Sequence, residues 1–516
     1  RWAERLRAGP DRRAIRQLER LAAVARRAVD PRVATVFDAT SPVWVDRPLA
    51  RCSAWYELFP RSASPDRDRP GTLADVVRRL PYIAEMGFDV VYLPPIHPIG
   101  ARNRKGANNA TAARPGDPGS PWAIGGAEGG HTAVHPELGS VADVEQLVAA
   151  ARTHDLEIAL DLAFQTSPDH PWVREHPAWF RHRPDGTIAF AENPPKRYED
   201  IYPIDFDTAD RESLWLELRD VVRFWVERGV RVFRVDNPHT KAFPFWEWAM
   251  AAIRHDHPET IFLAEAFTRP RVMERLAKVG FTQSYTYFTW RNAKWEIVDY
   301  FQELTDRNHL DYFRPNVWPN TPDILHATLQ SGTRATFIAR FLLAAGLAAA
   351  YGIYGPVFEL QERTAREADS EEYLHSEKYE IRHWDLDRPD SLRHLIGLVN
   401  RIRRAHPALQ RDDTLRFHTV DNDMILAWSK RATLPDGTED ALLFVVNLDP
   451  VHTQSGWTSL DLDALGLAHD TEFEVRDLLT EARYAWKSAH NFVQLDPATV
   501  PAHVFAFEHG ASGARA

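Results

Sequence analysis

The sequence predicts an α/β protein with a (β/α)8 TIM barrel, long loop insertions in that barrel and a C-terminal antiparallel β-sandwich. From residue 51 onward, short apolar segments alternate with longer amphipathic segments, which is typical of parallel strands joined by helices. The length of this alternation favours a closed eightfold barrel over an open doubly wound sheet. After about residue 410, short apolar segments are separated by turn-rich stretches such as LPDGTED, which indicates antiparallel strands.

These patterns divide the 516 residues into three predicted parts, as expected for a chain too long for one core. Residues 1–50 are predicted to be an N-terminal helical segment, which we interpret as part of a truncated N-terminal region. Residues 51–410 are expected to form the barrel and residues 411–516 the β-sandwich. Loop insertions are expected at 97–140 and 165–206, after strand ends where barrel active sites are assembled.

Each barrel strand is expected where an apolar run ends at a turn signal. The expected strands are WYEL at 55–58, DVVYLPP at 89–95, LEIALDLAF at 156–164, GVRVFRVD at 229–236, IFLAEAF at 261–267 and SYTYF at 284–288. Thr72, with Asp75 three residues later, and Ser140 are expected to cap two of the intervening helices. The apolar run from Phe341 to Ile353 predicts a buried helix that leads into a strand. In the β-sandwich, the expected strands are TLRFHTV, MILAWS, ALLFVVNL, TEFEVRDLL, NFVQL and HVFAFE.

Composition excludes several classes of function. The formal net charge of −11 disfavours nucleic acid or an anionic membrane as the main partner, because both reward basic patches. No apolar run is long enough to span a bilayer, and no signal peptide is visible. Cys52 is the single cysteine, so no internal disulfide can form, which fits a cytoplasmic location. The sequence has no CxxC, HExxH or early GxGxxG pattern, so we expect no metal, no cofactor and no nucleotide site.

The strand RVFRVD carries the first candidate for chemistry. Side chains alternate along a strand, so Arg234 and Asp236 share one face while Phe233 and Val235 share the other. The two apolar residues suit the helix layer, which places Arg234 and Asp236 in the barrel mouth. One interpretation is a carboxylate nucleophile that the arginine keeps ionised. The alternative is a structural ion pair.

Glu265 ends the next expected strand by the same geometry. Apolar surroundings should raise the pKa of its carboxyl group, which suits proton donation. Carboxylates on successive barrel strands are what retaining glycosyl transfer requires, since one attacks the anomeric carbon and the other moves a proton. Taken alone, Glu265 could instead cap a helix or form a surface ion pair. Asp323, in WPNTPD, is a third candidate, although its local context indicates only a turn.

In their order along the chain, these residues resemble the α-amylase superfamily, glycoside hydrolase family 13. The residues that carry the resemblance are Asp161, Arg234, Asp236, Glu265, Asn320 and Asp323. It implies that Asp236 is the nucleophile, Glu265 the general acid/base and Asp323 a ligand of sugar hydroxyls. The stretches FQTS and NTPD lack the histidines that typical amylases carry there, which argues against ordinary hydrolysis.

Longer stretches resemble one subgroup, the α-1,4-glucan:maltose-1-phosphate maltosyltransferases. They include WYELFPRS, RKGANN, DLAFQTSPDHPW, AENPPKRYEDIYPIDFD, FRVDNPHTK, LAEAFTRP, FTQSYTYFTWRN and EKYEIR. The resemblance implies a set of residues that grip the sugar and phosphate of the donor: Lys105, Gln165, Asp200, Asn237, Lys378 and Tyr379. An ammonium group and amides in the Lys105 loop could receive anionic oxygens. The histidines of the two insertions, His131, His135, His170 and His176, are interpreted as dispersed hydrogen-bonding residues.

The resemblance therefore implies a retaining glycosyltransferase that moves maltosyl units from α-maltose 1-phosphate to an α-1,4-glucan acceptor. Two alternatives stay open: a glucan hydrolase or trehalose-forming isomerase of the same superfamily, and a non-catalytic glycan-binding protein. A homodimer is also left open, because members of the subgroup resemble homodimers whose contacts involve an N-terminal domain.

Overall fold

The computed structural model describes residues 44–193, 196–469 and 472–508. Most of the predicted N-terminal helical segment, residues 1–43, lies outside the described residues. The end of that segment forms the short helix α3, Pro48–Arg51, directly before the first strand.

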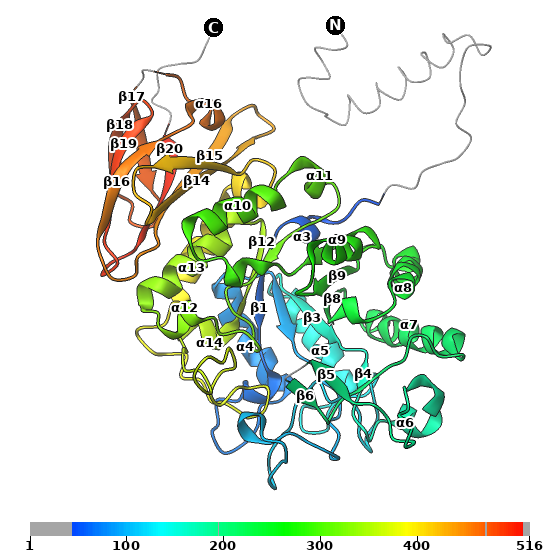
Figure 1. The fold of residues 1–516 in the computed structure, drawn as a ribbon. Helices are drawn as coiled ribbons and strands as arrows, with labels where there is room; N and C mark the ends of the chain where they lie inside the picture. The colour runs from blue at the N-terminus through cyan, green and yellow to red at the C-terminus, as the bar shows by residue number, and fades with distance from the viewer. Residues whose placement is uncertain (1–43, 194–195, 470–471, 509–516) are drawn as a thin grey trace, which may run out of the picture. The chain divides into compact units, whose positions relative to one another are not determined.

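Eight parallel strands form the predicted barrel (Figure 1). They are β1 Ser53–Glu57, β2 Val90–Leu93, β3 Glu157–Leu162, β8 Val232–Asp236, β9 Ile261–Glu265, β10 Gln283–Ser284, β11 Asn316–Val317 and β12 Ala350–Tyr354. Neighbours follow the order β10-β9-β8-β3-β2-β1-β12-β11, and a parallel bridge between Ser284 and Pro315 joins the two ends. The prediction of a closed (β/α)8 barrel is therefore confirmed.

Helices separate the strands along the chain. They are α4 Leu73–Glu85, α5 Val141–Arg152, α7 Arg211–Glu227, α8 Phe243–Asp256, α9 Pro270–Lys278, α10 Lys294–Leu304, α11 Arg307–Leu310, α12 Ala327–Gln330, α13 Arg334–Leu347, α14 Gly355–Glu359 and α15 Arg393–Ala405. Both predicted caps are present, each as a reciprocal capping box: Thr72 with Asp75 on α4, and Ser140 with Asp143 on α5. Each box satisfies two backbone N–H groups that would otherwise lack partners.

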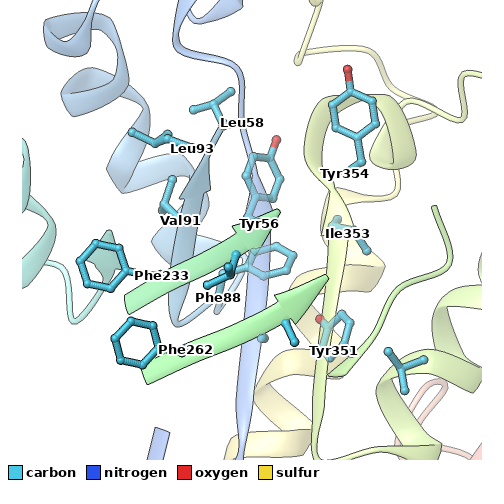
Figure 2. Close-up of a cluster of buried hydrophobic side chains, with 14 of the residues drawn as sticks. Tyr56, Leu58, Phe88, Val91, Leu93, Phe233, Phe262, Tyr351, Ile353 and Tyr354 are labelled. Atoms are coloured by element: carbon cyan, nitrogen blue, oxygen red, sulfur yellow. The ribbon is translucent and has the colours of Figure 1, made fainter. Parts of the chain in front are cut away.

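Alternating side chains give the barrel an inner and an outer core. The inner core is a small cluster that includes Trp55, Tyr92 and Trp318. The outer faces of the strands belong to the main cluster, where Phe233 of β8 stacks on Phe262 of β9 with 5.7 Å between ring centroids (Figure 2). Burial of each such side chain stabilises the fold by about 1.5–3 kcal/mol. The predicted alternation in RVFRVD is confirmed, because Phe233 faces the helix layer and its neighbour Arg234 faces inward.

The two predicted insertions contain only short elements: η2 Ala107–Asn109, β4 Gln165–Thr166, α6 Pro171–Glu175, η3 Pro177–Trp179, β5 Ala191–Asn193, β6 Lys196–Tyr198 and β7 Tyr202–Pro203. Buried histidines connect them. His131 Nε2 donates to the carbonyl of Ala163, its Nδ1 lies 3.1 Å from His170 Nε2, and His170 Nδ1 accepts from the Trp172 amide. We expected His131 and His170 to be dispersed, and this prediction is wrong. The fold brings the two insertions together at the end of β3, so the two histidines lie in contact.

The C-terminal region is an eight-stranded antiparallel sheet. Its strands are β13 Arg416–Val420, β14 Ile425–Thr433, β15 Glu439–Asn447, β16 Gln454–Ser459, β17 Glu472–Asp477, β18 Arg483–Lys487, β19 His490–Leu495 and β20 Ala502–Glu508, in the order β18-β17-β20-β15-β14-β13-β16-β19. The sheet closes over a hydrophobic cluster that includes Val475 of β17 and Val493 of β19. The predicted antiparallel C-terminal fold is confirmed.

Several strands depart from the sequence-based expectations. The expected strand 284–288 is only the end of β10, followed by the 3-10 helix η5, Tyr287–Trp290. The Thr286 side chain accepts from the Phe288 amide and starts that helix, so local capping overrides the β-propensity of the aromatic residues. Strands β11, β16 and β18 were not expected, because β11 has only two residues and most side chains of β16 and β18 are exposed or only partly buried.

The sheet packs directly on the barrel. Trp428 of β14 stacks on Phe444 of β15, and its indole Nε1 donates to the carbonyl of Gly346 in α13 at 3.3 Å. A Cβ on Gly346 would lie 2.8–2.9 Å from these two rings, so the close approach requires glycine. The boundary near residue 410 stays a prediction.

Candidate active site

Four charged side chains meet where three neighbouring barrel strands end. Asp161 of β3 pairs in register with Arg234 of β8, and Asp236 of β8 pairs with Glu265 of β9. Alternation along the strands points all four into the barrel mouth. The carboxyl ends of barrel strands are where active sites of this fold are built. The structure thus brings together Arg234, Asp236 and Glu265, which the sequence singled out separately.

Arg234 is the hub of this cluster. Its Nη1 donates to Asp161 Oδ2 at 2.8 Å and to Asp236 Oδ1 at 2.9 Å, while Nη2 lies 3.5 Å from Glu265 Oε2. The side chain of Arg234 is 7% exposed, and that of Asp161 is fully buried. Tyr92 adds a hydrogen bond to Asp161 Oδ2 at 2.5 Å. A planar guanidinium can hold several carboxylates in fixed positions, which an ammonium group cannot do.

Burial sets the protonation of the carboxyl groups. Loss of solvent raises the pKa of Glu265 above its ordinary value, although Arg234 opposes that effect. Burial also raises the pKa of Asp161 to about 7, again against the pull of Arg234. A raised pKa favours the protonated form of Glu265, which suits a group that gives and takes up a proton.

The turn after β8 fixes the position of the acid/base candidate. Asn237 has a left-handed backbone, with φ of 42°, a conformation that asparagine adopts more readily than most residues. In this conformation its N–H donates to Glu265 Oε2 at 3.1 Å. Lys241 Nζ donates to the carbonyl oxygens of Asp236 and Asn237 at 3.1 and 3.2 Å. Lys241 was missed by sequence reasoning, because nothing distinguishes it from a solvated lysine.

Asp323 lies beside the other predicted substrate-binding residues. Lys378 Nζ donates to Asp323 Oδ1 at 2.6 Å and lies 5.1 Å from the centre of the Trp122 ring. Burial alone would lower the pKa of Lys378, but Asp323 and Tyr379 outweigh it and raise that pKa well above its ordinary value. Gln165 Nε2 donates to the Trp122 carbonyl at 3.4 Å. Lys378, Tyr379 and Gln165 thus surround one side of the site.

Lys105 and Asp200 come together from the two loop insertions. Lys105 is buried and forms an ion pair with Glu199, the neighbour of Asp200. Burial raises the pKa of Asp200 to about 6, although Lys105 and Lys378 lower it. One carboxyl oxygen of Asp200, Oδ1, is buried without a hydrogen-bond partner. A buried polar atom with no partner costs free energy, so its place is suited to a ligand that donates a hydrogen bond.

Glu57, at the end of β1, is a carboxyl group that sequence reasoning did not single out. It is 1% exposed, and its Oε2 has no hydrogen-bond partner. Burial raises the pKa of Glu57 well above its ordinary value, although Arg234 opposes this shift. The sequence feature that could have identified Glu57 is its position two residues after Trp55. Alternation along the strand places both side chains inside the barrel, as it does for Arg234 and Asp236.

Asp236 and Glu265 are register partners on adjacent parallel strands, so their side chains leave the sheet side by side. Adjacent strands lie about 4.8 Å apart. Retaining enzymes place their two carboxyl groups about 5–5.5 Å apart, whereas inverting enzymes need about 6.5–9.5 Å to admit a water molecule.

Among the described residues, no group of histidine, cysteine, aspartate or glutamate side chains could hold a metal ion. No described helix is long and apolar enough to cross a membrane.

Comparisons with known proteins agree with this geometry. Residues 57–216 match the family model "Alpha amylase, catalytic domain", and residues 417–507 match the model "GLGE, C-terminal". The chain is 54% identical over 493 residues to the alpha-1,4-glucan:maltose-1-phosphate maltosyltransferase of Chlorobaculum tepidum, covering 94% of this chain and 73% of that protein. The chain belongs to the alpha-1,4-glucan:maltose-1-phosphate maltosyltransferase family. The maltosyltransferase of Methylacidiphilum infernorum is 52% identical over 463 residues, covering 90% of this chain and 69% of that protein.

Solved structures support the fold of this maltosyltransferase-family chain. An alpha-amylase from Lactobacillus plantarum superposes with a TM-score of 0.67 at 21% identity, covering 90% of this chain and all of that one. The maltogenic alpha-amylase AmyB from Thermotoga neapolitana gives a TM-score of 0.68 at 16% identity, covering 89% and 99% of the two chains. The resemblance inferred from the sequence motifs, both to the superfamily and to the maltosyltransferase subgroup, is confirmed.

Proposed function

We propose that this chain transfers maltosyl units from α-maltose 1-phosphate to the non-reducing end of α-1,4-glucans, with retention of configuration and release of phosphate. The observation that carries the proposal is the Arg234 cluster, which holds two carboxylates of adjacent strands at one strand-end mouth. Relatives at 52–54% identity carry the name of this reaction. The substrates and the role of each residue are part of the proposal.

In the first step, one oxygen of Asp236 attacks the anomeric carbon of the donor. A carbon–oxygen bond forms to the enzyme as the bond to phosphate breaks, and phosphate leaves with the electron pair. Arg234 orients Asp236 for this attack, because its Nη1 is bound to Asp236 Oδ1. Phosphate is already a stable anion, so this step needs little help from Glu265.

In the second step, the 4-hydroxyl group of the glucan end attacks the same carbon from the side that phosphate left. Glu265 removes the hydroxyl proton, and Asp236 leaves as a free carboxylate, so the configuration is retained. The N–H of Asn237 fixes Glu265 Oε2 during this step. Asp323 would bind ring hydroxyl groups, and its contact would strengthen as the ring distorts in the transition state.

The donor would be held by the predicted set Lys105, Gln165, Asp200, Asn237, Lys378 and Tyr379. Lys105, which is buried, and Lys378, which is partly exposed, bring two ammonium groups close to Asp200, since both lower the pKa of that residue. Two cations suit a dianionic phosphate better than a neutral sugar. A hydrolase or trehalose-forming isomerase of the same superfamily would share Asp236 and Glu265 but has no use for this pair of cations.

The direct test supplies α-maltose 1-phosphate and maltohexaose to the protein. We expect stoichiometric phosphate release and products longer by two glucose units. Asp236→Ala should lower the rate by at least about 10⁴-fold, because no other residue can form the covalent intermediate. As a matched control, Asp205→Ala removes an aspartate that bonds Arg181 in the insertion and should leave the rate within about twofold. Products from unphosphorylated maltohexaose alone would overturn the proposal in favour of the hydrolase.

We extend the proposal to the setting of the enzyme. The unpaired Cys52 suits a reducing cytoplasm. The homodimer stays a prediction, and sedimentation of the protein at several concentrations would test it.

A further inference from the structure

The C-terminal sheet exposes a pair of aromatic side chains that packing does not require. Trp457 of β16 and Phe492 of β19 are cross-strand partners, with ring centroids 5.6 Å apart. They are 53% and 50% exposed. Alternation places them on the outer face of the sheet, since their neighbours Thr458 and Val493 are buried. Two large aromatic side chains side by side on an outer face are a feature of binding surfaces, because water solvates them poorly.

Side chains that can form hydrogen bonds flank this aromatic pair on both sides. The next outward-facing pair in one direction is Ser455 with Gln494, and in the other it is Ser459 with His490. Ser459 Oγ lies 3.0 Å from His490 Nδ1. The backbone beneath is also fixed, because the Trp457 amide donates to Asp421 at 2.7 Å. The result is an apolar centre, with the two rings inclined at 62°, between two polar margins.

A cavity whose lining combines polar side chains with Val500 and Ala502 adjoins the same surface. It has a volume of about 360 Å³, and its lining includes Thr453, Thr480, Gln494, Asp496, Thr499 and His503. Gln494 belongs to both features: it follows Phe492 by two residues on the same strand face, so the two are separated by about 7 Å. The wall is rigid, because the fully buried Asp477 accepts hydrogen bonds from Thr480 Oγ1 at 2.7 Å and from the Val504 amide, and it lies 2.9 Å from His503 Nδ1.

The chemistry of this surface selects a neutral ligand with many hydroxyl groups. Neither the three outward-facing pairs nor the cavity lining contains lysine or arginine. A phosphorylated sugar or a nucleic acid would need such cations. A sugar chain matches both parts, because pyranose rings have an apolar face that can stack on Trp457 and a hydroxyl rim that can reach the cavity.

We propose that Trp457, Phe492 and the adjoining cavity form a second carbohydrate site, which binds an internal segment of the α-1,4-glucan acceptor. This inference rests on the proposed function, which supplies a polymer as the second substrate. Its residues belong to β16, β19 and the neighbouring C-terminal loops, whereas every proposed catalytic residue belongs to the barrel. Binding one segment of a polymer at the sheet raises the local concentration of its chain ends, so the site should matter for long acceptors and not for short ones.

The test compares the wild-type protein with the double variant Trp457→Ala/Phe492→Ala in gels that contain glycogen. We expect the dissociation constant for glycogen to rise about 10-fold, as loss of two stacking contacts implies. With maltohexaose as acceptor, the rate and KM should stay within twofold, whereas KM for glycogen should rise.

Gln494→Ala tests the cavity independently and should weaken glycogen binding about threefold. Trp295→Ala is the matched control, because Trp295 is 67% exposed but lies on α10 of the barrel.

Several outcomes would overturn the proposal. One is an unchanged affinity for glycogen in the double variant, and another is an equal loss of glycogen affinity in Trp295→Ala. A third is a change of oligomeric state with unchanged glycogen affinity, which would make the patch a protein interface. Failure of the proposed function is distinguishable, because glycogen binding needs no maltose 1-phosphate. A protein that binds glycogen through Trp457 but releases no phosphate would retain this site and lose the proposed reaction.

Discussion

Two clusters of buried polar groups lie near the end of β3, and burial acts on them in opposite ways. In the Arg234 cluster, burial raises the pKa of Asp161 and Glu265, and the arginine opposes it. In the histidine cluster of the insertions, burial lowers the pKa of His97, His131 and His170 to about 4, 3 and 2. The histidines have no acidic partner to offset that effect. The first cluster therefore combines a guanidinium with acidic groups, whereas the second consists of neutral imidazole rings.

The difference shows what each cluster is suited to do. His131 donates from Nε2 and accepts at Nδ1, so both ring nitrogens are used and a further proton would break the chain of bonds to His170. Such a chain holds two loops together but cannot exchange protons with a substrate. Glu265, by contrast, is held by one backbone N–H and a guanidinium at 3.5 Å, which leaves its carboxyl group able to gain and lose a proton. Only the charged cluster suits chemistry.

Among the changes that test the contrast between the two clusters, Glu265→Gln has the largest expected effect, and it separates the two chemical steps. Phosphate leaves without acid help, but the acceptor hydroxyl group needs a base. We expect one equivalent of phosphate per enzyme in a rapid burst, followed by turnover that is slower by about 10²–10⁴-fold. Azide needs no base and should restore turnover. Rapid quenching with phosphate detection measures both phases, and steady turnover at the normal rate would exclude Glu265 as the acid/base.

Sequence patterns were sufficient for the charged cluster and insufficient for the neutral one. The alternation in RVFRVD placed Arg234 and Asp236 inside the barrel, and the adjacent strand placed Glu265 beside them. The link between His131 and His170 depends on how two long loops fold over each other, which no local periodicity encodes. The approach is close enough to require glycine: a Cβ on Gly130 would lie 2.1 Å from His170 Nε2.

The same limit applies to the edges of the candidate site. Resemblance selected Lys105 and Asp200, but the ion pair of Lys105 with Glu199 and the raised pKa of Asp200 arise only when the two insertions meet. Glu57 and Lys241 were missed, the first because strand ends with glutamate are common and the second because its role is to bind backbone carbonyls. Contacts between segments distant in sequence are thus the part that a single sequence leaves undetermined.

A smaller effect is expected from Arg234→Leu, which removes the hub of the charged cluster. Asp161 and Asp236 would then be buried without a compensating charge, and the free energy of unfolding should fall by about 3–5 kcal/mol. Urea denaturation at pH 7.5 measures the loss. The control is Arg181→Leu, whose exposed pairing with Asp205 at 3.2 Å should contribute less than about 1 kcal/mol. Equal losses in the two variants would mean that the buried cluster is no more costly to break than a surface pair.

The smallest effect tests the neutral cluster through pH. A histidine whose folded pKa is about 4 binds a proton in the unfolded chain below about pH 6.5 but not in the folded protein until pH 4. Its contribution to stability is therefore complete above pH 6.5 and declines as the pH falls toward 4. The carboxyl groups with raised pKa act in the opposite direction, because folding lets them take up protons in the same range.

His97→Asn isolates the histidine contribution, since the asparagine amide can keep the hydrogen bond to the Ala133 carbonyl. The carboxyl groups are common to both proteins and cancel in the comparison. Between pH 6 and 4.5, the free energy of unfolding of the wild-type protein should fall more steeply than that of His97→Asn, by up to about 1.4 kcal/mol per pH unit. Urea titrations at several pH values give both slopes. Parallel slopes would mean that His97 titrates normally in the folded protein, and the contrast between the two clusters would then rest on His131 and His170 alone.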